Sequence, residues 1–169
     1  DWEDGDPDSG TSGSHTYFTP GTYRVTLSVE DKDGGIGSAS VVVVVTAKAI
    51  EIDIHPGSDK NPINLGSGGV TPVAILTTND FDATTIDRST LVFGRGGATP
   101  SHKSLGHVED VDGDGDSDLM THYKTGDIGL LESDTSACVT GVTDGGVVFE
   151  GCDVVAPKAS KGKGKGKGE

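Results

Sequence analysis

Long apolar runs and strong helix formers are both scarce in this chain. The longest apolar run, Val41 to Val45, is the length of a strand and falls far short of the roughly 20 residues that a transmembrane helix needs. Methionine occurs once, whereas glycine occurs 27 times among abundant Val, Thr and Ser. This composition favours short strands joined by tight turns. We therefore expect an all-β fold with almost no helix and no membrane insertion.

Sequence signatures of catalysis are also missing. The chain contains no G-x-S-x-G elbow and no phosphate-binding loop, so we expect no enzymatic activity. The histidines lack the H-x-H or H-x-x-x-H spacing of a zinc site; they are His15, His55, His102, His107 and His122. The first residue is not Met and the chain starts inside a motif, so we expect a mature or excised portion of a longer precursor.

Positive charge is scarce except at one end. The formal net charge is −14, and five of the 13 basic residues lie in the last twelve positions, where Glu169 is the single acid. That leaves 8 basic against 26 acidic residues in the rest of the chain. Such a body repels nucleic acid and anionic lipid and favours cations as partners. We expect the basic tail to contact the acidic body of a neighbouring copy.

Cysteine occurs only twice, at Cys138 and Cys152, on either side of the turn sequence Asp144 to Gly146. In a hairpin with that turn the two residues would lie opposite each other, within reach of a cross-strand disulfide. Two buried free thiols are the alternative. The acidic composition, rich in Gly and Thr, favours the disulfide and an oxidising, extracellular compartment.

The first 46 residues carry several motifs in order. They are Trp2 with Asp4 to Asp6, Ser14 to Tyr17, Pro20 to Tyr23, and an Asp-rich turn at Asp31 to Gly35 before a valine strand. This segment resembles the second half of a polycystic-kidney-disease (PKD) type repeat. The resemblance implies an immunoglobulin-like β-sandwich used for extracellular spacing and adhesion. We predict strands at Ser14–Phe18, Thr22–Glu30 and Ser38–Thr46, with apolar residues alternating along the second.

The resemblance begins at the family's Trp strand, so the opening strands of the sandwich are not represented. A sandwich without them would leave an apolar face and a strand edge exposed, which invites pairing with another chain. Two explanations stay open. Either an upstream part of the same precursor supplies the strands, or a neighbouring subunit completes the sheet by strand addition.

A second block of many short strands follows and is predicted to form a sandwich or small barrel. The predicted strands are Ile50–His55, Val70–Thr77, Thr90–Phe93, His107–Val111, Asp118–Tyr123, Ala137–Val142 and Gly146–Glu150, with a helical turn near Ile86–Ser89. The block resembles a β module common in secreted bacterial and archaeal proteins. The motifs are IDIHPGSDKNPINLGSGGVTPVAIL, DFDATTIDRSTLVFG, GHVEDVDGDGDSDLMTHY and GVTDGGVVFEGCD.

The strongest candidate site is the loop from Asp110 to Asp118, which fits D-x-D-x-D-G-x-x-D. Oxygens at this spacing suit a hard cation such as calcium. An EF-hand would need a Glu where Thr121 stands, and helices on both sides. The loop instead resembles the calcium hairpins of integrin β-propellers. That resemblance implies side-chain ligands from Asp110, Asp112, Asp114 and Asp118 and a main-chain carbonyl from Asp116.

Weaker acidic groups could hold a second calcium ion with oxygens brought from elsewhere, or could be solvated turns, which we favour for each. These groups are Asp31 with Asp33, Asp53 with Asp59 and Asn64, Asp80 with Asp82, and Glu3 with Asp4 and Asp6.

Together these observations predict two small β-sandwich-like modules and a flexible tail. The expected boundaries are 1–47 for the incomplete PKD-type module, 48–156 for the calcium-binding module and 157–169 for the Lys/Gly tail. We expect a calcium-stabilised structural subunit of an extracellular fibre or cell-surface assembly, with copies of itself as partners. The alternative is a non-catalytic accessory module of a secreted hydrolase or adhesin that binds carbohydrate or cell-surface components, or acts as a spacer.

Overall fold

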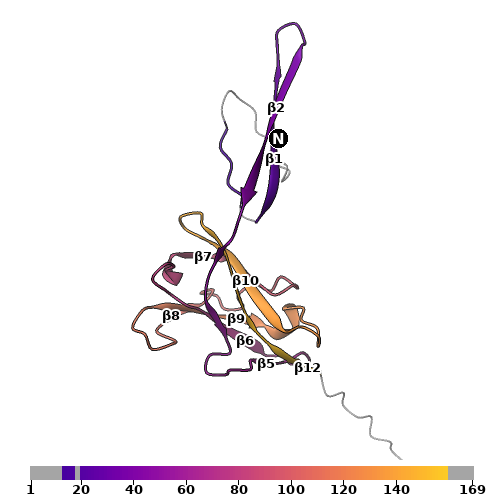
Figure 1. Cartoon of the computed structure of the whole chain (residues 1–169). Helices are drawn as coiled ribbons and strands as arrows, with labels where there is room; N and C mark the ends of the chain where they lie inside the picture. Colours follow the sequence, from indigo (N-terminus) through magenta and orange to yellow (C-terminus); the bar gives the residue numbers. More distant parts are fainter. Residues whose placement is uncertain (1–12, 18–19, 160–169) are drawn as a thin grey trace, which may run out of the picture. The chain divides into compact units, whose positions relative to one another are not determined.

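The computed structural model describes residues 13–17 and 20–159, which form two compact units divided after Ala47 (Figure 1). The described residues contain strands and two short 3-10 turns but no α-helix, so the prediction of an all-β chain is confirmed. In this part of the chain no helix has the length and apolar character that a membrane span requires.

The first unit is built on one antiparallel hairpin, β1 (Gly21–Glu30) with β2 (Ile36–Val45). The Asp31 side chain shapes the connecting turn by accepting the backbone N–H groups of Asp33 and Gly35, each at 2.8 Å. Both strands agree closely with the prediction. The predicted first strand does not form over residues 14–17, which are not in a strand, and Phe18 lies outside the described residues together with Trp2 and Asp4 to Asp6.

The second unit contains two four-stranded sheets and one two-stranded sheet. Their orders are β3-β11-β10-β7, β4-β6-β9-β8 and β12-β5. The strands are β3 (Lys48–Ala49), β4 (Ile52–Ile54), β5 (Pro62–Asn64), β6 (Val70–Ile75), β7 (Ile86–Phe93), β8 (His107–Glu109), β9 (Asp118–Lys124), β10 (Ser136–Thr143), β11 (Val148–Val154) and β12 (Ala156–Lys158).

Side chains from both four-stranded sheets form one buried core, which makes this unit a β-sandwich. Phe93 of β7 lies with its ring centre 5.0 Å from that of Tyr123 of β9, and both residues are fully buried. Phe149 of β11 meets Phe81 at 5.3 Å. The Phe93–Tyr123 contact joins the two sheets, as the inward-facing residues of a sandwich do.

Two predicted features of the second unit are wrong in detail, and two strands were missed. The helical turn lies at η1 (Ala83–Thr85), where Asp82 accepts the backbone N–H of Thr84 at 2.9 Å, while Ile86 already starts β7. Ordered structure continues beyond the expected start of the tail at residue 157, because β12 pairs in parallel with β5. Neither β5 nor β12 was predicted. The remainder of the tail, residues 160–169, lies outside the described residues.

Candidate functional site

The loop that carries the aspartates connects β8 to β9. Pairing of Glu109 with Asp118 closes its base, so residues 110–117 form the excursion. Gly113 and Gly115 have φ angles of 82° and 98°, a conformation that glycine adopts without steric cost. The two glycines therefore allow the chain to turn sharply while the alternate aspartates stay close together.

Asp118 anchors the loop to the sandwich. The residue is completely buried, and its Oδ1 and Oδ2 accept the backbone N–H groups of Thr77 and Val111, each at 2.8 Å. A buried carboxylate needs such partners or a cation, since burial otherwise penalises the charge strongly. Each carboxylate oxygen keeps a further lone pair, so Asp118 can also bind a cation from this fixed position.

Asp110, Asp112 and Asp118 come together at the mouth of the loop. One carboxylate oxygen from each lies within 4.8 Å of the other two. Oxygens bound to one calcium ion at about 2.3–2.6 Å are at most about 5 Å apart, so this spacing fits calcium. Asp110 is held in place by the N–H groups of Gly113 at 2.8 Å and Gly115 at 3.2 Å.

The other two predicted ligands, Asp114 and Asp116, lie outside that group. The Asp114 carboxylate accepts the backbone N–H of Asp116 at 2.8 Å. The N–H of Asp114 in turn lowers the pKa of Asp112, but desolvation and repulsion from Asp114, Asp118 and Asp110 outweigh it and raise that pKa. A cation among these carboxylates would remove the repulsion. The structure thus gathers three of the four predicted side-chain ligands.

Two of the weaker acidic groups serve their own turns. The N–H groups of Gly35 and then Asp33 lower the pKa of Asp31, which is consistent with a hydrogen-bonded, solvated turn. Asp82 caps η1. The group of Asp53 with Asp59 and Asn64 is different. Desolvation and repulsion from Asp153 raise the pKa of Asp53, a half-buried residue. Glu3, Asp4 and Asp6 lie outside the described residues.

Three histidines that are dispersed in the sequence meet on the outer side of β9. The ring of His122 lies 5.1 Å from that of His102 and 6.2 Å from that of His107, measured between ring centres. Burial, followed by the charges of His102 and His107, lowers the pKa of His122, which Glu109 partly opposes. The pairing of His107 with Met120 brings β8 alongside His122, and no spacing in the sequence signals it.

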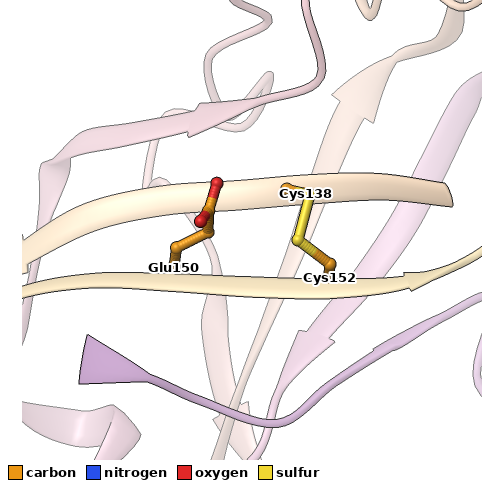
Figure 2. A group of neighbouring side chains, drawn as sticks. All are labelled: Cys138, Glu150 and Cys152. Carbon is orange, nitrogen blue, oxygen red and sulfur yellow. A yellow bond between two sulfur atoms is a disulfide. The ribbon is translucent and has the colours of Figure 1, made fainter. Parts of the chain in front are cut away.

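The predicted disulfide between Cys138 and Cys152 is present, with a Cα–Cα distance of 4.0 Å. The two residues are direct partners in the β10–β11 hairpin. Figure 2 shows Glu150 of β11 beside the disulfide, and its carboxylate lies within 4.8 Å of the sulfur atoms. Because both sulfurs are consumed by the S–S bond, they cannot act as thiolate ligands, and this group is not a metal centre.

The β1–β2 hairpin leaves apolar side chains in solvent. Its register places seven residues on one face, which we call the hairpin face: Tyr23, Val25, Leu27, Val29, Ala39, Val41 and Val43. Tyr17 stacks on Tyr23 with ring centres 4.0 Å apart and covers that end of the face. Beyond this end of the face, Leu27, Val29 and Val41 are 60%, 58% and 58% exposed.

A family model described as the PKD domain matches residues 1–46. The predicted PKD resemblance of the N-terminal segment is confirmed. The matched segment is about a quarter of the chain. No curated protein matches the sequence significantly.

Three solved structures are similar to the chain over about four fifths of its length. One is Bacteroides ovatus SGBP-B of the mixed-linkage glucan utilization locus, in complex with a mixed-linkage heptasaccharide. It has a TM-score of 0.34 and 15% identity, and the match covers 81% of this chain and 30% of that chain. A 1.5-MDa bacterial ice-binding adhesin has a TM-score of 0.35 and 18% identity, covering 82% and 42%.

The third structure is a Ca2+-stabilized adhesin of an Antarctic bacterium that binds ice, with a TM-score of 0.36 and 17% identity, covering 82% of this chain and 32% of its own. This chain therefore spans between 30% and 42% of the length of the three proteins. The low scores add no argument about function.

Proposed function

We propose that the chain is a non-catalytic, calcium-stabilised structural subunit of an extracellular fibre or surface assembly, in which copies join through the hairpin face. The observation that carries the proposal is the exposure of Leu27, Val29 and Val41 on a two-stranded sheet. A contiguous apolar patch of this kind marks an interaction surface in a soluble protein. The PKD match over residues 1–46 and the disulfide support an extracellular, oxidising setting.

A second copy suits this face for reasons of shape and charge. An isolated hairpin is marginally stable in water, and addition of a further strand or sheet supplies the missing layer. Burying a half-exposed Leu or Val side chain contributes about 1–2 kcal/mol, so three of them drive association appreciably. The basic residues of the C-terminal tail would add attraction to the acidic body of the neighbour.

Calcium would brace the second unit through the loop at Asp110 to Asp118. The donor set supports this role, because three carboxylates meet within 4.8 Å and the buried Asp118 ties the loop to Thr77, two residues after the end of β6. A bound ion stabilises the folded state by mass action, since the unfolded chain does not preserve the site.

The carbohydrate-binding alternative has less support. Sugar sites present exposed aromatic side chains, whereas Phe81, Phe93, Tyr123 and Phe149 are buried in the core. Tyr17 and Tyr23 are half-buried against each other. In the described part of the chain no aromatic ring is offered as a stacking platform.

Light scattering and negative-stain electron microscopy of the full chain in calcium test the proposal. We expect polymers of the natural chain, and monomers after Leu27→Asp, because a carboxylate on the hairpin face opposes its burial. Ser28→Asp is the matched control on the opposite face and should assemble normally. Monomeric natural protein, or unimpaired assembly of Leu27→Asp, contradicts the role of this face.

The calcium part is tested separately by thermal melting of the second unit with and without a chelator. We expect the chelator to lower Tm, and Asp112→Asn to abolish most of that difference while folding normally, because Asp112 is exposed. Melting that ignores the chelator removes calcium from the proposal and leaves the assembly surface untouched.

A further inference from the structure

Thr77 joins the calcium loop to the crossover between the two sheets of the second unit. The crossover, residues 76–85, connects β6 of one sheet to β7 of the other. The N–H of Thr77 donates to Asp118 Oδ1 at 2.8 Å, and its hydroxyl donates to the carbonyl oxygen of Ser117 at 2.6 Å. The same Oγ1 accepts the N–H of Ala83 at 3.0 Å. One residue thus contacts two consecutive residues at the end of the loop and the first residue of η1.

The crossover holds Thr77 on both sides. The N–H of Leu76, the preceding residue, donates to the carbonyl oxygen of Glu51 at 3.0 Å. Thr78 and Phe81 exchange backbone hydrogen bonds at 2.7 and 3.2 Å, and Phe81 is buried in the core. Because both neighbours of Thr77 are fixed in this way, its hydroxyl meets the calcium loop from a rigid part of the sandwich.

The bond to Ser117 lies between two of the predicted calcium ligands. Ser117 separates Asp118 from Asp116, whose carbonyl the integrin resemblance implies as a ligand. With its carbonyl oxygen held by the Thr77 hydroxyl, the peptide that leads into Asp118 is fixed, and the N–H of Thr77 fixes the carboxylate of Asp118 itself. Hydrogen-bonded partners of this kind orient the ligands of a metal site, and a displacement of roughly 1 Å is enough to weaken the site.

We infer that Thr77 is a positioning residue for calcium, because its hydroxyl holds the end of the loop in the conformation that binds the ion. The inference rests on the proposed calcium site. It adds a residue that the spacing of the aspartates does not reveal, since Thr77 lies 41 residues before Asp118 in the sequence. The same hydroxyl links the loop to η1, so ordering of the loop by calcium should reach Ala83, which is completely buried.

Substitutions to Val and to Ser separate the hydroxyl from the rest of the side chain. Thr77→Val has nearly the same shape and keeps the backbone bond to Asp118, but it loses both hydroxyl bonds. Thr77→Ser keeps the hydroxyl and loses one methyl group. A residue that only supports the fold would change the Tm of the calcium-free protein and leave the calcium Kd of the folded protein unchanged. A positioning residue changes that Kd, and Ser restores it.

Calorimetric titration of the full chain with calcium tests the inference, at a temperature where every variant is folded by circular dichroism. We expect Thr77→Val to raise the Kd about tenfold, the lower end of the effect of such partners, and Thr77→Ser to stay within about twofold of the natural chain. The matched control is Thr90→Val. Thr90 Oγ1 likewise donates to a carbonyl oxygen, that of Asp87 at 2.6 Å, and accepts an N–H, that of Val142 at 2.9 Å. Neither partner belongs to the calcium loop, so the Kd should not change.

The outcomes distinguish this inference from the proposed calcium site. A natural chain that binds no calcium removes the site itself and the role of Thr77 with it. A natural chain that binds calcium, with an unchanged Kd in Thr77→Val, overturns the role of Thr77 alone. An equal rise in Kd in Thr90→Val also overturns that role, because the effect would then follow the stability of the whole unit.

A spectroscopic measurement on the natural chain covers the case in which Thr77→Val fails to fold. Backbone amide signals are followed by NMR during the same titration. The amides of Val111 and Thr77 donate to Asp118, so both should shift as calcium binds. The amide of Ala83 donates to Thr77 Oγ1 and should shift with the same saturation curve. An Ala83 signal that stays in place while the Val111 signal shifts overturns the inference.

Discussion

Removal of the disulfide should destabilise the second unit by about 3 kcal/mol. The bond joins residues 14 apart in sequence, and closing a loop of about 15 residues removes roughly that much chain entropy from the unfolded state. Cys138 is half-buried and Cys152 is exposed, so replacing both with Ala leaves little cavity. The loss therefore comes almost entirely from the unfolded chain. For a unit of this size it corresponds to a fall in Tm of about 12 °C.

The double variant Cys138→Ala/Cys152→Ala is compared with the natural chain by urea unfolding at fixed calcium, followed by circular dichroism. The matched control is Thr140→Ala/Glu150→Ala, the next directly paired residues on the same face of the hairpin, which should change stability by less than about 1 kcal/mol. The natural chain treated with a reductant should behave like the cysteine variant. A loss below about 1 kcal/mol in the cysteine variant would refute the loop-entropy argument.

Two further changes test the packing and the electrostatics of the second unit. Because burial and the neighbouring His102 and His107 lower the pKa of His122, the unfolded chain takes up a proton more readily as pH falls below about 6.5, and stability is lost there. His122→Gln should therefore show a smaller fall in Tm between pH 7.5 and pH 5.5 than the natural chain, and an equal fall would contradict the assignment. A Cβ on Gly96 would lie 2.2 Å from the backbone oxygen of residue 127, whereas one on Gly126 would meet nothing within 4 Å. Gly96→Ala should cost about 1–3 kcal/mol in urea unfolding and Gly126→Ala less than about 0.5 kcal/mol, and similar values for the two would show that the loop yields easily.

Local patterns predicted most of the strands because the relevant information is local. Alternation along Thr22 to Glu30 and the Asp-Gly-Gly turn between the cysteines each specify a hairpin within a few residues. Strands β5 and β12 were missed for a physical reason. Each has three residues, each contains a proline, and they pair in parallel across more than ninety residues of sequence. Proline argues against a strand at the sequence level, although an edge strand tolerates it.

The same difference between local and distant contacts applies to the candidate sites. The spacing of aspartates in one loop predicted the group of Asp110, Asp112 and Asp118, because its ligands are neighbours in sequence. The weaker group at Asp53 and Asp59 has a neighbour from β11 that is distant in sequence. The sequence suggested Asn64 for this group, whereas the structure places Asn61 and Asp153 beside it. Strand pairing decides which asparagine or aspartate lies at this turn. The backbone of Asn61 itself has a positive φ of 41°.

The position of the disulfide governs how the second unit would respond to tension along the chain. Its first and last strands are β3 and β12, and β3 pairs with β11, which runs directly into β12. A pull at the two ends therefore reaches β11 early. Once β11 detaches, the bond from Cys152 to Cys138 passes the load to β10. It withholds the chain between the two cysteines, which are 14 positions apart in sequence, or about 50 Å of extended chain. The redox state of one bond thus sets how far the unit lengthens under a given load.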